Sequence, residues 1–502
     1  MSASTLLLGI DIGTQAVKAV AVNPEGVVGH RAVIERTPSH PHPGWVDMDT
    51  EQGLWVAVLR VIAQMVQTGL DLDSIRVIGV TGMVPCLTPI DAAGDPVGPT
   101  ILYSDNRALE ELAWANRTAG LDLTAQAVIP KLVWLRRHRP RDFARIRTVF
   151  SAHNYVVFRL TGQRCIDYDT CSIMGGIFDD LANGWKPEVL QRLDLDSGFF
   201  PPPQPAVAVV GVTTSEAASA TGLPVDVPVI AGTGDTFATM LGCGVIEPGD
   251  GMVSFGTTGL LTLIQRPLAE SAAGPHFDHG EGVASVAWVA NVLSAGRLVS
   301  WYMDMFDRKA RTTARRDEAG RYAMVEAEAG RLPPGADGLL VLPHWLGRRT
   351  PQPDPNLRGA IIGLAPGHTP AHIYRAILES FAYNQRQTFD PVRQRFDRLV
   401  ATAGGAHSRL WRQIVTDILN FPLEYYRMAS GALGIAFLAG HAAGLISDFH
   451  VVKHDWLKDP EITVPDQGAV AAYDRYFDVY CEFEERMADP FKRLCSASET
   501  PL

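Results

Sequence analysis

Residues 6–22 read LLLGIDIGTQAVKAVAV, and this stretch decides the fold that the sequence predicts. An apolar run stops at Asp11, the chain crosses Gly13 and Thr14, and a second apolar run ends at Val22. Short apolar runs on both sides of turn residues are typical of adjacent strands. The sequence therefore predicts a buried hairpin whose turn carries a carboxylate, a glycine and a hydroxyl.

The residues that follow extend this hairpin into a three-stranded meander. NPEG at 23–26 has the proline and glycine positions of a type I turn, and residues 27–35 read as a third strand. Residues 49–70 carry apolar side chains at three- and four-residue spacing, which predicts a helix, and residues 75–82 read as a buried strand. Strands that alternate with helices indicate an α/β fold.

The turn at Gly13 and Thr14 has the chemistry of a phosphate site. A tight Gly-Thr turn presents consecutive backbone N–H groups and a hydroxyl to an anion. Asp11 beside phosphates requires a cation, and Mg²⁺ prefers oxygen ligands, while Lys18 is close enough in sequence to reach a phosphate. The alternative is a plain hairpin, with glycine supplying the turn conformation and aspartate capping it.

The composition is that of a globular protein with more than one domain. The 502 residues, 46% hydrophobic, are too many for one core and predict two large domains. The net charge of −11 argues against nucleic-acid binding, because no surplus of cations is available to replace phosphate counterions. Six cysteines without CxxC spacing indicate reduced thiols in a cytoplasmic protein. We expect no signal peptide and no membrane span.

A second copy of the opening pattern begins near the middle of the chain. EPGDG at 247–251 is a break typical of a hinge, and residues 252–264 again read strand, Gly-Thr turn, strand. Asp11–Gln15 lines up with Ser254–Thr258, which indicates a duplicated unit. Two such turns predict a triphosphate site between two domains. The chain has no Gly-Lys dipeptide, which excludes a Walker A loop.

Two further positions are candidates for chemistry on a hydroxyl group. Asp235 follows a strand at 227–231 through the turn GTGD and precedes a helix pattern. A carboxylate there can accept the proton of a hydroxyl that attacks a γ-phosphoryl group. The alternative is that Asp235 is the N-cap of the following helix, a position that aspartate favours. Asp105 and Arg107, in YSDNR, are candidates for binding polyol hydroxyls, and the alternative is a surface ion pair.

These motifs together resemble the FGGY family of carbohydrate kinases. GIDIGTQAVKAV at 9–20 resembles the first phosphate motif of that family, VSFGTTG at 253–259 the second, and VIAGTGD the turn of the catalytic base. AGGAHSRLW at 403–411 resembles the adenosine motif. Residues 359–379 fit one family signature throughout, and PKLVWLRRH at 130–138 matches the core of the other.

The resemblance implies roles for individual residues. Asp235 would be the catalytic base, and Asp11 and Asp235 would flank a Mg²⁺ ion that accompanies ATP. The residues implied to contact ATP are Thr14, Gln15, Lys18, Gly256, Thr257, Gly296, Gly404, Gly405, Ser408 and Arg409. Those implied on the acceptor side are Met83, Asp105, Asp235 and Thr236. The implied partners are ATP or ADP and a small sugar or polyol, and the family also implies a homodimer.

Among members of this family, the chain is most similar to the xylulokinases. Where those enzymes carry Gln-Met-His, this chain has Met83, Val84 and Pro85, and where they carry an asparagine after the base it has Thr236. Sites built for particular hydroxyls discriminate sharply when their partners change. Ribulose, erythrulose or erythritol, glycerol and an autoinducer-type dihydroxyketone therefore stay open as acceptors. A non-enzymatic sensor or regulator with the ATPase fold is a further alternative.

The resemblance covers roughly residues 6–446 and implies the sugar kinase/actin/heat-shock ATPase fold. This α/β fold has two RNase H-like domains with a nucleotide and substrate cleft between them. We assign residues 1–247 to an N-terminal domain, 248–450 to a C-terminal domain, and 451–502 to a helical tail packed on the C-terminal domain.

Overall fold

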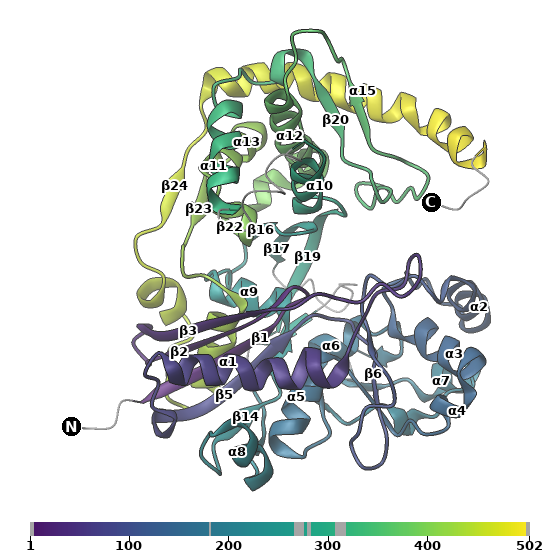
Figure 1. Ribbon diagram of the computed structural model, residues 1–502, viewed down its shortest axis with the longest axis vertical. Coiled ribbons are helices and arrows are strands. Elements are labelled where there is room, and N and C mark those ends of the chain that lie inside the picture. The colour runs from purple at the N-terminus through teal and green to yellow at the C-terminus, as the bar shows by residue number, and fades with distance from the viewer. Residues whose placement is uncertain (1–4, 180–181, 266–275, 279–282, 307–317, 498–502) are drawn as a thin grey trace. The chain divides into compact units, whose positions relative to one another are not determined.

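The computed structural model describes residues 5–179, 182–265, 276–278, 283–306 and 318–497 (Figure 1). The chain divides into two compact units. The first comprises Met1–Ile246, Arg266–Val286 and Met428–Lys458, and the second comprises Glu247–Gln265, Ala287–Arg427 and Asp459–Leu502. The first change of unit falls within one residue of the boundary that the sequence suggests.

The first unit is built on the predicted meander. Its sheet has the strand order β13-β14-β5-β1-β2-β3, with β15 also paired to β5. These strands are β1 (Leu6–Ile12), β2 (Ala16–Val22), β3 (Val28–Glu35), β5 (Ile75–Gly82), β13 (Val209–Val212), β14 (Pro228–Ile230) and β15 (Thr233–Gly234). β1, β2 and β3 are antiparallel neighbours, and β5 runs parallel to β1. The hairpin, the third strand and the buried strand at 75–82 are thus confirmed.

Alternate residues of β1 face two different layers. Leu8 and Ile10 belong to a core that includes apolar residues of α1 (Val56–Gln67). Gly9, between them, faces α14 (Gly431–Ala442), and a Cβ on Gly9 would lie 2.0 Å from the backbone oxygen of Ala432. Only glycine lets the helix approach the strand this closely. The alternation therefore turns Asp11, two residues on, toward the first turn of α14.

The packing of α14 differs from the domain division suggested by the sequence. We assigned residues 428–450 to the C-terminal domain and 451–458 to its tail, but all of 428–458 belongs to the first unit. The physical reason is that α14 packs on β1, on β5 and on α9 (Asp235–Gly242). Such packing between segments distant in sequence leaves no signature in the local pattern of residues.

Gly434→Ala should lower the free energy of unfolding by about 1–3 kcal/mol, since an added methyl group in a closely packed contact forces the backbones apart. A Cβ at Gly434 would lie 1.9 Å from the backbone oxygen of Ala238 in α9. Urea unfolding would measure the loss. Gly98→Ala is the control, because a Cβ there would meet nothing within 4 Å. Equal stability of the two variants would contradict this helix contact.

Helices and short strands make up the rest of the first unit. The predicted helix at 49–70 consists of a π-helical turn, Glu51–Trp55, followed by α1. The other helices are α2 (Leu109–Ala119), α3 (Val128–His138), α4 (Pro140–Phe143), α5 (Ala152–Thr161), α6 (Tyr168–Ile173), α7 (Pro187–Arg192) and α8 (Ser215–Thr221). The short strands are β4 (Asp47–Met48), β6 (Thr88–Ile90), β7 (Thr100–Ile101), β8 (Thr148–Phe150), β9 (Ile166–Asp167), β10 (Phe178–Asp179), β11 (Gly184–Trp185) and β12 (Pro203–Gln204).

The second unit repeats the arrangement of the first. Its main strands follow the order β19-β17-β16-β22-β23-β24. They are β16 (Asp250–Phe255), β17 (Gly259–Gln265), β19 (Val283–Val292), β22 (Arg398–Thr402), β23 (Leu423–Tyr425) and β24 (Glu461–Thr463), with β20 (Leu340–Leu342) and β21 (Ala360–Ile362) in a separate pair. β16 is antiparallel to β17 and parallel to β22, as β1 is to β2 and β5. The predicted duplication is therefore confirmed for the order and direction of the central strands.

Helices of the second unit gather around α12, as Figure 1 shows. They are α10 (Gly296–Phe306), α11 (Glu318–Ala329), α12 (Pro370–Phe389), α13 (Arg409–Leu419) and α15 (Gln467–Ala497). α15 forms the larger part of the predicted helical tail, and it packs on α13 and carries Tyr473 into the core of this unit. The end of the chain therefore belongs to the second unit.

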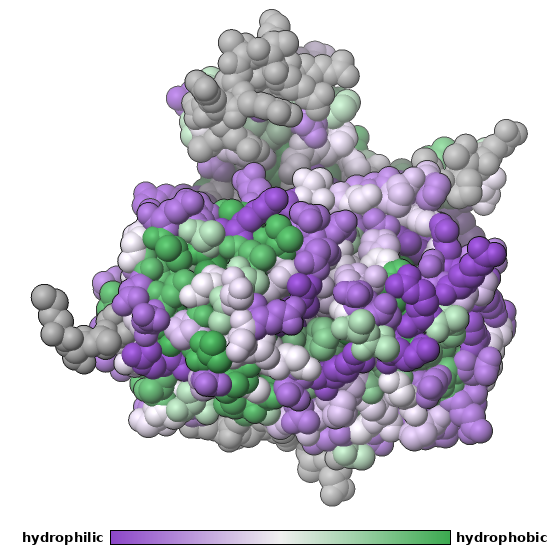
Figure 2. Space-filling view, turned by 60° about the horizontal axis from the view of Figure 1, so that its bottom comes forward, coloured by the Kyte–Doolittle hydropathy of each residue, from purple (hydrophilic) through white to green (hydrophobic). Residues whose placement is uncertain are grey.

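The molecular surface is mixed in character. Figure 2 shows apolar side chains gathered on one part of the face in view and hydrophilic side chains over much of the rest. The exposed large apolar side chains of the first unit include Val66, Val209, Val212 and Val225. In the described parts of the chain, no helix combines the length and apolar character that crossing a membrane requires.

Candidate active site

Asp11 lies near the carboxyl end of β1, on the face covered by α14. The residue is 8% exposed, and its Oδ1 has no hydrogen-bond partner among the described residues. A Cβ at Gly431, the first residue of α14, would lie 3.3 Å from its Oδ2. Burial raises the pKa of Asp11, and the charges of Lys18 and Arg36 act in the opposite direction. Lys18 is the cross-strand partner of Asp11, so the two side chains leave the same face of the sheet.

Asp235 reaches the same edge of this sheet by way of β15. β15 pairs in parallel with the last residues of β5, and β1 pairs with the same end of β5. The pKa of Asp235 is raised to about 7, chiefly by desolvation and also by the charge of Asp11, while hydrogen bonds from Thr236 oppose the shift. A carboxyl group with a pKa near neutrality is suited to accept a proton at neutral pH. Gly234 is the N-cap of α9, so the N-cap alternative for Asp235 is wrong.

The first turn, residues 13–15, is held by hydrogen bonds at both ends. The N–H of Gly13 donates to the carbonyl oxygen of Ala16 at 3.0 Å. Arg36 Nε donates to the carbonyl oxygen of Gly13 at 3.0 Å, and the N–H of Arg36 donates to the carbonyl oxygen of Gln15 at 2.8 Å. Sequence reasoning missed Arg36, since an arginine at the end of an amphipathic strand reads as exposed. The structure instead places it against the turn.

Asp105 and Arg107 form a buried pair, so the surface-pair alternative is wrong. Asp105 is 1% exposed, and its Oδ1 accepts hydrogen bonds from the N–H and Nε of Arg107, each at 2.9 Å. Its Oδ2 accepts from Arg107 Nη2 at 2.7 Å and from the N–H of Val46. The guanidinium also contacts Asp47 and lies 4.2 Å from the centre of the Trp45 ring. Donors of the protein itself therefore occupy both oxygens of Asp105.

Met83 and Val84 differ in how accessible their side chains are to a ligand. Met83 is fully buried, and its Sδ accepts weak contacts from Thr14 Oγ1 at 3.7 Å and Arg36 Nη2 at 4.0 Å. Val84 is partly exposed and packs against Gly234, where a Cβ would lie 2.5 Å from its Cγ2. The accessible residue beside the turn of Asp235 is therefore Val84 rather than the predicted Met83.

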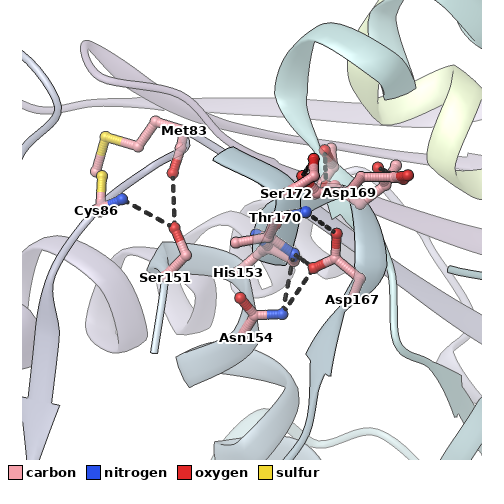
Figure 3. A network of polar contacts seen from close by, with 11 residues as sticks. Met83, Cys86, Ser151, His153, Asn154, Asp167, Asp169, Thr170 and Ser172 are labelled. Carbon is pink, nitrogen blue, oxygen red and sulfur yellow. Dashed lines mark hydrogen bonds and ion pairs between the residues drawn. The ribbon is translucent and has the colours of Figure 1, made fainter. Parts of the chain in front are cut away.

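A buried polar layer supports the loop after β5 (Figure 3). Ser151 Oγ accepts the N–H of Cys86 at 3.1 Å and donates to the carbonyl oxygen of Met83 at 3.4 Å. Close by, His153 Nε2 and Asp167 Oδ2 are 2.7 Å apart, and both side chains are fully buried. This layer is a part of the site that the sequence did not reveal.

The short strand that precedes Asp235 is fixed by two hydroxyl groups. The hydroxyl of Thr233 donates to Asp169 Oδ2 at 2.5 Å, and the hydroxyl of Thr81 donates to the carbonyl oxygen of Thr233 at 2.6 Å. Both bonds are buried. They hold the backbone on which the Asp235 side chain stands.

The second turn, residues 256–258, joins β16 to β17. The N–H of Gly296 donates to the carbonyl oxygen of Gly256 at 2.8 Å, and the N–H of Arg297 donates to that of Thr257 at 3.2 Å. A Cβ at Gly296 would lie 2.8 Å from the Gly256 oxygen, so a glycine is needed for this contact. The structure thus brings Gly256, Thr257 and Gly296 together at the start of α10.

The segment after β22 reaches the same edge of the second sheet, because β22 runs parallel to β16. Gly404 and Gly405 form a short helical turn there, and a Cβ at Gly405 would lie 2.4 Å from the Trp411 ring. Ser408 Oγ accepts the N–H of Trp411 at 3.0 Å and caps α13. The side chain of Arg409 is 83% exposed. Each unit therefore gathers its predicted phosphate and nucleotide residues near the carboxyl ends of its central parallel strands.

Comparisons with known proteins agree with this geometry. Residues 6–242 match the N-terminal domain of the FGGY family of carbohydrate kinases, and residues 251–443 match the C-terminal domain. The xylulose kinase of Escherichia coli is 29% identical over 87% of this chain and 90% of the relative. The gluconokinase of Bacillus licheniformis is 25% identical over 98% of each chain.

Solved structures show the same likeness. The xylulose kinase of Rhodospirillum rubrum is 29% identical, with a TM-score of 0.80, over 97% of this chain and all of that chain. A xylulose kinase from Brucella ovis is 26% identical, with a TM-score of 0.81, over 96% of this chain and 99% of that chain. The protein therefore belongs to the FGGY family of carbohydrate kinases, which are phosphotransferases.

Proposed function

We propose that this kinase transfers the γ-phosphoryl group of ATP to a hydroxyl of a small ketose or polyol, with Asp235 as the general base. The observation that carries the proposal is the pair of carboxylates at one sheet edge, of which Asp235 has a pKa of about 7. The negative charge of Asp11 contributes to that value. Many enzymes raise the pKa of a catalytic carboxyl group in this way, so that it transfers protons near neutral pH.

The chemical step then has a simple balance of bonds and protons. An acceptor oxygen forms a bond to the γ-phosphorus while the bond from that phosphorus to the leaving oxygen of ADP breaks. Asp235 accepts the proton of the acceptor hydroxyl. Thr236, whose hydroxyl lies 3.4 Å from Asp235 Oδ1, helps to orient the carboxylate.

Asp11 and Asp235 are suited to hold Mg²⁺. Asp11 Oδ1 is buried without a hydrogen-bond partner, and a cation would satisfy it. Magnesium typically binds through one or two carboxylates together with water and substrate phosphates, which matches a pair of aspartates. When bound, the ion would neutralise charge on the β- and γ-phosphates.

The nucleotide residues remain those that the sequence suggests, and the acceptor residues need one change. We propose phosphate contacts for Thr14, Gln15 and Lys18 in the first unit. In the second unit the proposed nucleotide contacts are Gly256, Thr257, Gly296, Gly404, Gly405, Ser408 and Arg409. On the acceptor side we add Val84, which is partly exposed where Met83 is buried.

D-Xylulose is the first acceptor to test, because several relatives that match most of the chain are xylulose kinases. Gluconate is the second, since a gluconokinase also matches almost the whole chain. A coupled ADP-release assay with Mg-ATP should include both, together with L-xylulose, the ribuloses, glycerol, erythritol, erythrulose and a dihydroxyketone. One acceptor with strong, saturable ADP release would identify the substrate. ATP binding without any acceptor-dependent turnover would favour a sensor or regulator instead.

Thr257→Val should raise the KM for ATP about tenfold and leave the KM for the acceptor nearly unchanged. The substitution keeps the volume but removes a hydroxyl donor, and a lost hydrogen bond to a charged group costs about this much. Steady-state kinetics with each substrate varied in turn would measure it. Thr118→Val, at an exposed position of α2, is the control. An unchanged KM for ATP would contradict the proposal that the second turn contacts the nucleotide.

A further inference from the structure

Arg36 makes an unusual set of contacts at the end of β3. Its Nε donates to the carbonyl oxygen of Gly13 at 3.0 Å, and its Nη2 donates to the same oxygen. Its Nη1 donates to the carbonyl oxygen of Gly53, and its backbone N–H donates to that of Gln15 at 2.8 Å. One arginine therefore fixes two carbonyl groups of the first turn and ties that turn to the segment ahead of α1.

The fixed carbonyl of Gly13 determines where the next N–H points. A trans peptide is planar, so its C=O and the following N–H point in opposite directions. The Arg36 guanidinium holds the Gly13 oxygen on its own side, which turns the N–H of Thr14 to the other side. This N–H makes no hydrogen bond within the described part of the chain. It is therefore available to an anion.

Without Arg36, this peptide would be free to turn over. Glycine has a wide choice of backbone conformations, and a flipped Gly13–Thr14 peptide would present a carbonyl oxygen, rather than an N–H, to a phosphate. An oxygen in that place would repel the anion. Donors that are oriented in advance bind developing and fixed negative charge at no further cost of reorganisation.

The guanidinium also adds positive charge to this end of the sheet. Burial lowers the pKa of Arg36 to about 10, so it stays a cation at neutral pH. It lies within electrostatic reach of Asp11. A cation behind the turn favours anionic phosphate groups in front of it.

We propose that Arg36 is a positioning residue for the nucleotide phosphates: it locks the Gly13 carbonyl so that the Thr14 N–H faces the phosphate. The inference rests on the proposed ATP-dependent reaction. It adds a residue to that site that touches the turn rather than the substrate.

The binding of two ligands, one with and one without the β- and γ-phosphates, distinguishes a role of Arg36 in positioning the phosphates from a purely structural role. The test uses the full-length protein, Mg²⁺, a non-hydrolysable ATP analogue and AMP, with affinities measured by titration calorimetry. Arg36→Gln should weaken the analogue about 10- to 100-fold, the range expected when oriented or charge-assisted hydrogen bonds are lost. Affinity for AMP, which lacks the β- and γ-phosphates, should stay within about threefold. Arg36→Lys, which keeps the charge and one donor, should recover part of the loss.

Arg31→Gln is the matched control, since Arg31 lies on β3, is exposed and, within the described part of the chain, has a side-chain contact only with the sulfur of Met428. Unchanged affinity of Arg36→Gln for the analogue would overturn the inference. Parallel loss of both ligands together with a lower melting temperature would also overturn it, as a purely structural effect. Failure of the wild-type protein to bind the analogue would instead contradict the proposed function.

Discussion

Asp235→Asn is expected to lower kcat by about two to four decades, the usual contribution of a general base. The amide keeps the size of the carboxyl group, so substrate binding should change little, but it cannot accept the proton of the acceptor hydroxyl. Acceptor-dependent ADP release, measured with both substrates saturating, reports the loss. Asp122→Asn removes a carboxylate at an exposed position of the same unit and should leave kcat unchanged. A loss of only a few-fold in Asp235→Asn would remove Asp235 from the proton transfer.

The pH profile gives an independent check on the same residue. The base works as a carboxylate and its pKa is about 7, so kcat/KM should fall about tenfold per unit as the pH drops below that value. The negative charge of Asp11 raises the pKa of Asp235. Asp11→Asn should therefore move this acid limb to lower pH, in addition to slowing the reaction. An acid limb at the same pH in both proteins would contradict the coupling between the two carboxylates.

Local features of the sequence predicted the central elements well. The meander, the strand at 75–82, the turn before Asp235 and the second Gly-Thr turn follow from short apolar runs bounded by glycine, proline and polar residues. These signals are local because a strand–turn–strand unit is made by neighbours in the chain. The structure confirms these elements except in the turn before Asp235, where Thr233 and Gly234 form the short strand β15.

The features that sequence reasoning missed depend on contacts between distant segments. Gly9 marks the place where α14 crosses β1, but nothing near residue 9 says that its neighbour is residue 432. Arg36 reads as a surface residue until the first turn is placed beside it. Asp169 carries no local sign that it accepts a hydrogen bond from Thr233, 64 residues away. Such residues are chosen by packing, which no local pattern records.

Glu379→Ala is expected to lower the free energy of unfolding by about 3–5 kcal/mol, as happens when one partner of a buried ion pair is removed. Glu379 is fully buried on α12, and its Oε1 accepts hydrogen bonds from Arg375 Nε at 2.8 Å, the Tyr473 hydroxyl at 2.9 Å and the N–H of Gly335 at 3.1 Å. The change leaves the 6% exposed Arg375 without its carboxylate. It also removes a link to α15, which carries Tyr473. Urea unfolding followed by tryptophan fluorescence would measure the effect.

A control variant and the pH dependence of stability distinguish the buried Glu379–Arg375 pair from an exposed ion pair. Asp390→Ala breaks the pair that Arg386 forms with Asp390, a residue just beyond the end of the same helix whose side chain is 40% exposed, and should cost less than about 1 kcal/mol. Burial raises the pKa of Glu379 to about 7, so the folded state binds its proton more tightly than the unfolded chain does. The stability gained from that proton is complete below the unfolded pKa and is lost as the pH rises through about 7. Wild type should lose this increment between pH 5 and pH 8, whereas Glu379→Gln, which cannot ionise, should not. Parallel pH dependence in the two proteins would show that Glu379 stays ionised throughout, and that its buried charge is fully compensated by Arg375.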